Sequence, residues 1–147
     1  LPDGPALTAT QLEENKQAIY SAWKLGYDHV RHSLRHGFYQ GWDLHPAQFP
    51  IRYAACYTFF LEGLVESSDR LRNFVEKAAQ ATLAAGNVFD DAATAQGLLN
   101  YFLRALNCGA ITEAEIQATG LTLEEVQGRS FAKILIARRD KQTQAAN

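Results

Sequence analysis

The sequence predicts an all-α fold, an antiparallel four-helix bundle with short C-terminal helices. Apolar residues recur at intervals of three and four, helix-start signals are plain, and no segment shows the alternation of a convincing strand. A chain of 147 residues that is 47% hydrophobic is long enough for one domain with a hydrophobic core. We therefore expect one domain over residues 1–147, with a flexible tail over residues 140–147.

Three helix starts are indicated by a threonine that a glutamate follows three residues later. The threonines are Thr10, Thr112 and Thr122. In such a capping box the hydroxyl and the carboxylate accept hydrogen bonds from free backbone amides at the helix start. From Thr10 the helical spacing of apolar residues continues to Phe38, and Gly26 allows a break into two helices.

The next long helix follows a connection over residues 41–50, which contains two prolines and no periodicity. Pro50 suits the first turn of a helix, and the apolar stripe then continues from Ile51 to Val75. Residues 53–61 are apolar on every side. A helix of this kind must be covered from more than one direction, by the same subunit or by another.

The last long helix is predicted to open at Asp90 and Asp91, after a loop of small residues over 78–88. Acidic residues in a first turn interact favourably with the helix dipole. This helix should end near Gly109, and one or two short helices should occupy residues 112–139.

Composition limits the classes of function. The net charge is −2, but lysine and arginine are clustered over residues 29–36, 70–77 and 129–141, so a local stripe could neutralise a few phosphates. No apolar run reaches the length of a bilayer span, and the first residues lack the pattern of a signal peptide, so we expect a soluble intracellular protein. Cys56 and Cys108 match no ligand spacing and are expected to be small buried hydrophobes.

No known catalytic motif is present: we find no glycine-rich phosphate loop, no HExxH, no serine elbow and no CxxC. His29, His32 and His36 share one helix face, which leaves a metal enzyme as a third alternative. Arg31 and Arg35 lie close by in the sequence and would oppose a cation. We therefore expect no enzyme, no metal and no cofactor.

Two charged pairs have both a structural and a functional interpretation. Arg70 and Arg72 can be solvated residues near a helix end, or guanidinium groups that bind phosphate oxygens. Asp90 and Asp91 can be helix caps, or carboxylates that accept a hydrogen bond from a ribose hydroxyl or a base amine.

Several short motifs, in this order, resemble the coat proteins of rod-shaped plant RNA viruses, the tobamoviruses and tobraviruses. They lie between Arg31 and Phe131: Arg31 with Phe38 and Trp42; Gln48-Phe49-Pro50; Arg70-Leu71-Arg72; Phe89-Asp90-Asp91-Ala92-Ala93-Thr94-Ala95; and Arg129-Ser130-Phe131. The resemblance implies a subunit that polymerises into a helical rod and packages single-stranded viral RNA independently of sequence. It also implies localisation in the virion, and in the host cytoplasm during assembly.

By position, the resemblance assigns three groups of residues. It implies phosphate contacts by Arg31, Arg70 and Arg72, and contacts to the ribose or base by Asp90, Asp91, Thr94, Ala95 and Leu98. It implies an interface between subunits at Phe38, Trp42, Phe49, Phe59 and Phe60. The main alternative is a cellular helical-bundle adaptor that binds nucleic acid or protein and forms a small closed assembly.

Overall fold

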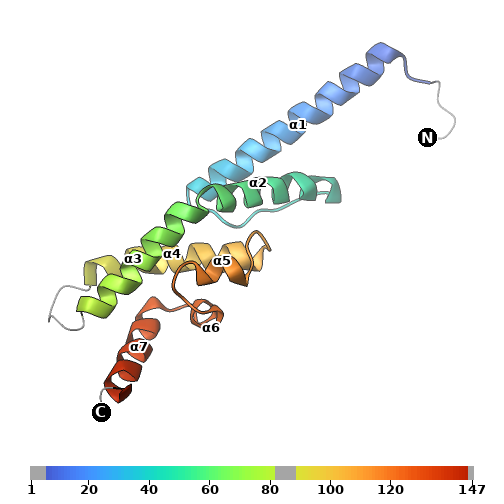
Figure 1. Ribbon diagram of the computed structural model, residues 1–147. Helices are drawn as coiled ribbons and strands as arrows, with labels where there is room; N and C mark the ends of the chain where they lie inside the picture. Colours follow the sequence, from blue (N-terminus) through green and yellow to red (C-terminus); the bar gives the residue numbers. More distant parts are fainter. Residues whose placement is uncertain (1–5, 82–88, 146–147) are drawn as a thin grey trace. The chain divides into compact units, whose positions relative to one another are not determined.

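The computed structural model describes residues 6–81 and 89–145, and these residues are mostly helical (Figure 1). They contain no strand, which confirms the all-α prediction. The chain divides into two compact units, residues 1–59 and 60–147. The helices are α1 (Ala9–Arg35), the 3-10 helix η1 (Pro46–Gln48), α2 (Phe49–Glu62), α3 (Leu64–Ala81), α4 (Phe89–Asn107), α5 (Glu113–Gln117), α6 (Leu123–Gln127) and α7 (Phe131–Ala145).

In the first unit, the cap of α1 lies two residues before the predicted one, and the helix continues through Gly26 without a break. Thr8, rather than Thr10, caps it: the Thr8 hydroxyl accepts from the Gln11 amide at 3.3 Å, and the Gln11 side chain accepts from the Thr8 amide at 3.0 Å. Gly26 lies inside the helix, and a Cβ there would be only 3.2 Å from Cγ2 of Ile51. This glycine permits close packing and does not end the helix.

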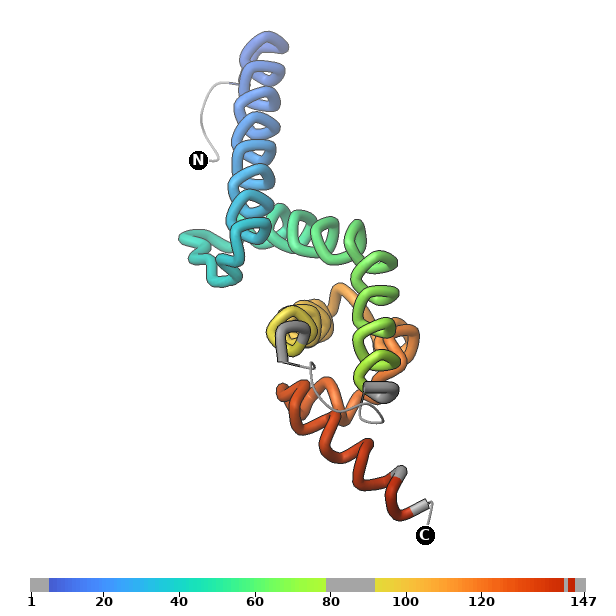
Figure 2. The backbone as a smooth tube through the Cα atoms, turned by 90° about the vertical axis from the view of Figure 1, so that its left-hand side faces the viewer, coloured from blue at the N-terminus to red at the C-terminus, as the bar shows by residue number. Residues whose placement is uncertain are grey.

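Both views place the C-terminal end of α1 beside α2 (Figures 1 and 2). The side chains buried here are few: Leu34 of α1, Ala55 of α2 and, unusually, Arg31. The first unit therefore has a small hydrophobic core, and much of α1 has no neighbour within that unit.

The predicted continuous helix from Ile51 is two helices, because Gly63 separates α2 from α3. Residues 78–81, predicted as loop, continue α3. Helices α3, α4 and α7 pack against one another around a core that α5 and α6 complete. Its largest fully buried side chains are Leu71, Leu99, Phe102, Ile116 and Val126.

The C-terminal region contains more helix than the sequence indicated. As predicted, α4 ends at Asn107, just before Gly109 with its positive φ of 76°. Thr122 forms the predicted capping box with Glu125, and at Thr112 the Glu115 carboxylate accepts from the backbone amide at 2.7 Å. Residues 140–145, expected as a flexible tail, belong to α7, and lysine, glutamine and alanine there have high helix propensity.

None of the helices in the described ranges combines the length and the apolar character that crossing a bilayer requires.

Candidate interaction surface

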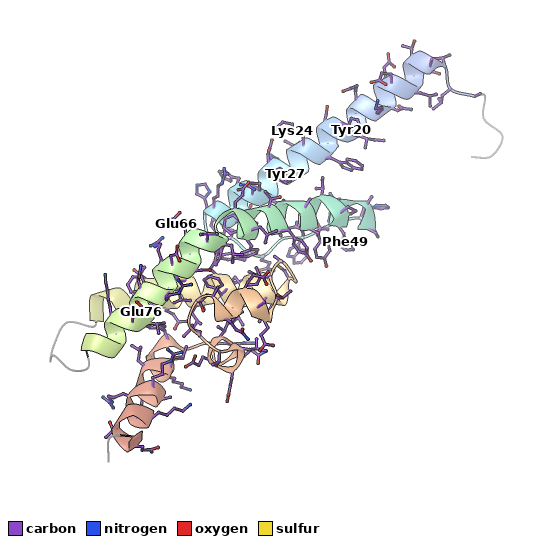
Figure 3. All side chains as sticks on the ribbon, in the orientation of Figure 1. Tyr20, Lys24, Tyr27, Phe49, Glu66 and Glu76 are labelled. Carbon is purple, nitrogen blue, oxygen red and sulfur yellow. The ribbon has the colours of Figure 1, made fainter. Side chains whose placement is uncertain are left out.

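The first predicted phosphate ligand, Arg31, is packed inside the first unit. Only 7% of the residue is exposed. Its Nη1 donates to the Tyr27 hydroxyl at 3.3 Å, and its guanidinium lies 5.6 Å from the centre of the Tyr27 ring, which Figure 3 labels. In this structure the Arg31 guanidinium is therefore largely covered.

Arg72 has a structural role within the second unit. Its Nε donates to the Ala118 carbonyl at 3.0 Å, and its Nη2 donates to the same oxygen. Asp69, one turn earlier, lies 3.4 Å from Nη1. Ala118 follows the last residue of α5, so Arg72 satisfies a carbonyl at a helix end that would otherwise need water. This arginine fixes the turn after α5.

Arg70 lies elsewhere on the same helix, because residues two apart on an α-helix do not share a face. Its side chain is exposed and lines a shallow hollow of about 210 Å³ with Asn73, Phe74 and Lys77. The motif Arg70-Leu71-Arg72 thus separates into an exposed arginine, a buried leucine and an arginine bonded to a distant turn.

The predicted base platform on α4 is mostly internal. Ala95 and Leu98 are buried in the second unit, and only Thr94 of the described platform residues is exposed. Because neighbouring side chains already cover this face, a nucleotide base could not rest on it in this structure. Asp90 and Asp91 lie in the first turn of α4, but their side chains fall outside the part of the chain that the structure describes.

The five predicted interface aromatics divide into two groups. Phe38, Trp42 and Phe49 are exposed, and Figure 3 labels Phe49 at the start of α2. Phe59 is half-buried, and Phe60 is buried in the second unit, where its ring packs edge-on against Tyr101 with centres 5.1 Å apart. Phe60 is therefore a core residue, and the accessible aromatics lie at residues 38–49.

The connection between α1 and η1 is held by a network of polar contacts. Arg52 donates through Nε to Asp43 at 2.5 Å, and its guanidinium occupies the position that a Cβ on Gly41 would take. The Gln48 side chain accepts from the amides of Leu44 and His45, at 2.7 and 3.1 Å. The His45 ring accepts from the Ala47 amide at 3.1 Å. The connection lacks helix but is fixed, and sequence reasoning identified it only as a loop.

This fixed connection directs two large apolar side chains into solvent. Trp42 is 81% exposed and Leu44 is 87% exposed, whereas the side chain of Asp43 between them is only 11% exposed. Large exposed apolar side chains on a rigid support are characteristic of protein interfaces.

An apolar stripe on α1 continues towards this connection. Along one face of the helix, Leu12, Ile19 and Trp23 are exposed, while Val30 and Leu34 of the same stripe are covered within the unit. A hollow of about 340 Å³ is lined by Trp23 from α1 and by Trp42 from the connection. We call Leu12, Ile19, Trp23, Trp42 and Leu44 the apolar surface of the first unit.

The histidines at the C-terminal end of α1 are the remaining candidates for a metal or reactive site. His32 and His36 lie close, with ring centres 4.2 Å apart, and Nδ1 of His36 lies 2.8 Å from the His32 carbonyl oxygen. Within residues 6–81 and 89–145 no three histidine, cysteine or acidic side chains are placed to hold a metal ion.

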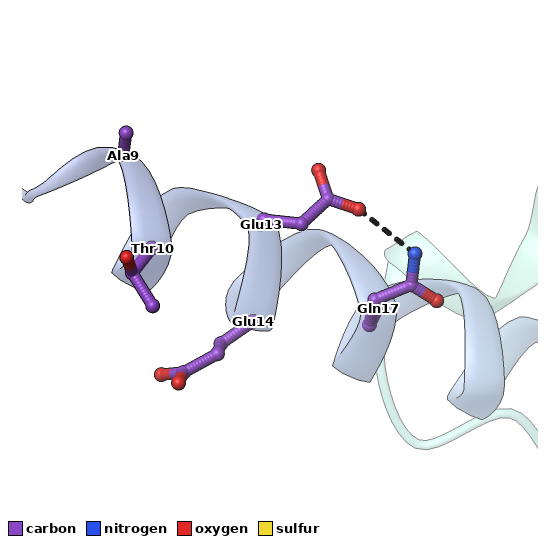
Figure 4. Close-up of a pocket in the computed structure, with 5 residues that line it drawn as sticks. All are labelled: Ala9, Thr10, Glu13, Glu14 and Gln17. Atoms are coloured by element: carbon purple, nitrogen blue, oxygen red, sulfur yellow. Dashed lines mark hydrogen bonds between the residues drawn. The ribbon is translucent and has the colours of Figure 1, made fainter.

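A hollow near the start of α1 is formed by one face of that helix alone (Figure 4). Within it, Gln17 donates to Glu13 at 2.9 Å, and the Glu14 carboxylate points to another side. The two carboxylates are therefore not arranged as an acid–base pair.

The fold and the surface define a class: an all-helical chain whose first unit exposes aromatic and aliphatic side chains on a fixed support. A family model described as "Domain of unknown function (DUF6986)" matches residues 5–134, and the chain belongs to this family. No curated protein and no solved structure matches the chain.

Proposed function

We propose that this chain is a helical association module, an adaptor-type protein that joins polypeptides through the apolar surface of its first unit. The observation that carries this proposal is the exposure of Trp42 and Leu44 on a connection that Arg52 and Gln48 hold in place. Association loses less conformational entropy when the contacting side chains are held before binding. Tryptophan is also enriched among residues that dominate binding energy.

The stripe on α1 supports the same proposal. A partner that covers Leu12, Ile19 and Trp23 would extend the packing that Val30 and Leu34 already have. Each large apolar side chain removed from water contributes on the order of 1.5–3 kcal/mol when fully buried. The uncovered length of this helix therefore gives a strong driving force for association.

Trp42 should become buried as the protein assembles. The chain has two tryptophans, so Trp23→Phe leaves Trp42 as the single reporter. We expect its fluorescence emission to shift to shorter wavelength as protein concentration rises, in parallel with a larger mass by sedimentation velocity. Leu44→Ser should weaken this assembly by about tenfold or more, because an apolar anchor is lost.

Val65→Ser is the matched control, because Val65 is also strongly exposed but lies on α3 of the second unit. It should assemble as the unmodified chain does. A monomer with solvent-like Trp42 emission at every concentration would contradict self-association through this surface.

The second candidate is a coat protein that packages single-stranded RNA in a helical rod. This candidate includes the antiparallel four-helix bundle as its fold. The exposure of Phe38, Trp42 and Phe49 favours it, since these aromatics would join neighbouring subunits. The burial of Arg31, Ala95 and Leu98 weighs against the RNA site that the resemblance implies.

Negative-stain electron microscopy separates the two candidates: rods or stacked disks indicate a coat protein, and small closed particles indicate an adaptor. For RNA binding, Arg70→Ala is the informative variant, because Arg72 bonds to the Ala118 carbonyl and its loss would disturb the fold. If RNA enters rods, Arg70→Ala should reduce the RNA content and lower the salt dependence of binding by about one phosphate contact. Unchanged RNA content would exclude Arg70 as a phosphate ligand.

A further inference from the structure

We propose that residues 38–44, which lie outside the helices, pair antiparallel as a β-strand with the same segment of a second copy of the chain, about a two-fold axis at Gly41. This inference rests on the proposed association function and specifies its mode of recognition. It also specifies the partner, which is another molecule of this chain.

The side chains along this segment alternate in direction with the period of a strand, although Gly41 in the middle is itself exposed. The residues that face outwards are Phe38, Gln40, Trp42 and Leu44, all exposed. Of the intervening positions, Tyr39 and Asp43 are half-buried, Asp43 accepts from Arg52, and the Arg52 guanidinium occupies the position that a Cβ on Gly41 would take. Successive residues point to opposite faces only in extended backbone, so the segment has the side-chain pattern of a half-covered strand.

The backbone in the middle of this segment is available for pairing. Within the described residues, neither the amides nor the carbonyls of residues 40–43 make a hydrogen bond. At the two ends the amides are already used: Phe38 donates to the Ser33 carbonyl at 2.9 Å, and Leu44 donates to the Gln48 side chain at 2.7 Å. An exposed row of free amides and carbonyls is a template for another strand.

The sequence of the segment is compatible with pairing to itself. Antiparallel pairing about Gly41 sets Phe38 opposite the partner's Leu44, and Gln40 opposite the partner's Trp42. Asp43 is the only charged residue in the segment, and it faces the partner's Tyr39. No like charges are therefore opposed, and apolar side chains meet across the pair.

The register also fits the free backbone groups. Residues 40 and 42 point their amides to the same edge of the strand, and these amides are free in the described structure. In the symmetric pair, Gln40 and the partner's Trp42 exchange two hydrogen bonds, and the reciprocal pair adds two more. The contact uses the same patch on both copies, so the product is a closed dimer.

Gln40 allows a sharp test, because its side chain is exposed and its amide is the group that must donate. Gln40→Pro removes the amide hydrogen, whereas Gln40→Ala keeps it and removes only the side chain. Sedimentation velocity should give a dissociation constant at least about tenfold weaker for Gln40→Pro than for Gln40→Ala. The Gln40→Ala value should be close to that of the unmodified chain. Equal dimerisation of the two variants would overturn strand pairing.

Amide hydrogen exchange on the unmodified chain tests the inference without any substitution. We expect the amides of Gln40 and Trp42 to exchange more slowly as protein concentration rises, with little change in α4. Association with unchanged exchange at both residues would overturn strand pairing but leave the association function in place. A chain that stays monomeric over the whole range would overturn strand pairing and self-association through this surface together, which makes the two failures distinguishable.

Discussion

Arg52→Met is expected to release the connection between α1 and η1, so that chymotrypsin cleaves near Tyr39 and Trp42 about 10 to 100 times faster than in the unmodified chain. The substitution removes the 2.5 Å hydrogen bond to Asp43 and leaves that carboxylate largely buried without its cation. Losing one partner of a largely covered ion pair costs about 1–3 kcal/mol after allowance for solvent contact. Such a loss would lower the free energy of local opening and expose the connection to the protease.

Two variants identify the cause. Arg35→Met removes an exposed arginine from the same unit and should leave the cleavage rate unchanged. Asp43→Asn combined with Arg52→Met should cleave more slowly than Arg52→Met alone, because the buried charge is gone. Equal cleavage of the Arg52→Met variant and the unmodified chain would show that Arg52 does not hold the connection.

Under the proposed association function, this ion pair would determine how rigidly Trp42 is presented to a partner. If Arg52 fixes the backbone of residues 41–43, Trp42 is presented in one position before any partner arrives. The same substitution should therefore weaken association as well, although Trp42 and Leu44 are both retained. A loose connection would have to be ordered on binding, and each ordered residue costs about 1–2 kcal/mol of backbone entropy.

The helix starts at Thr112 and Thr122 and the all-α class of fold could be predicted from the sequence, because capping and periodicity depend on residues a few positions apart. The glycines show the limit of this reasoning. Gly26 was a possible break and lies inside α1 against Ile51, whereas Gly63 lay within a predicted helix and separates α2 from α3. The role of Gly26 depends on its contact with Ile51, 25 positions away. The spacing of apolar residues along the chain carries no information about such a contact.

The candidate site was predictable only in part, for the same reason. Phe38, Trp42 and Phe49 are exposed, whereas Phe60, which the resemblance assigns to the same interface, is buried beside Tyr101. Arg72 looked like a ligand for phosphate, but its acceptor is a carbonyl 46 residues away. Arginine geometry suits carbonyl and phosphate oxygens alike, so residue type alone does not separate the two roles.

Two arginines from different helices hold the turn between α5 and α6. Arg72 of α3 donates to the Ala118 carbonyl, and Arg138 of α7 donates to the Gly120 carbonyl at 2.7 Å. Gly120 has a φ of 78°, a conformation that favours glycine. Short helices of five residues have little stability of their own, so these contacts explain how α5 and α6 persist.

Arg138→Met should destabilise the second unit by about 1–3 kcal/mol at neutral pH. Arg138 donates to both carboxylate oxygens of Glu125, at 2.6 Å each, in addition to the Gly120 carbonyl. Urea unfolding, followed by circular dichroism at 222 nm, would measure the loss. Arg139→Met is the matched control: Arg139 is more exposed and lies 3.6 Å from Asp140, so its removal should change stability by less than about 0.5 kcal/mol.

The effect of Arg138→Met should depend on pH with a definite sign. Hydrogen bonds from Arg138 hold the pKa of Glu125 below its usual range, although partial burial opposes them. A carboxyl group whose pKa is lower in the folded state stabilises the protein above its unfolded pKa, and this contribution is lost as pH falls through the folded value. The stability difference between the unmodified chain and the variant should therefore be constant near neutral pH and shrink below about pH 4. A difference that stays unchanged down to pH 2 would mean that the Gly120 carbonyl, and not the Glu125 carboxylate, is the important acceptor.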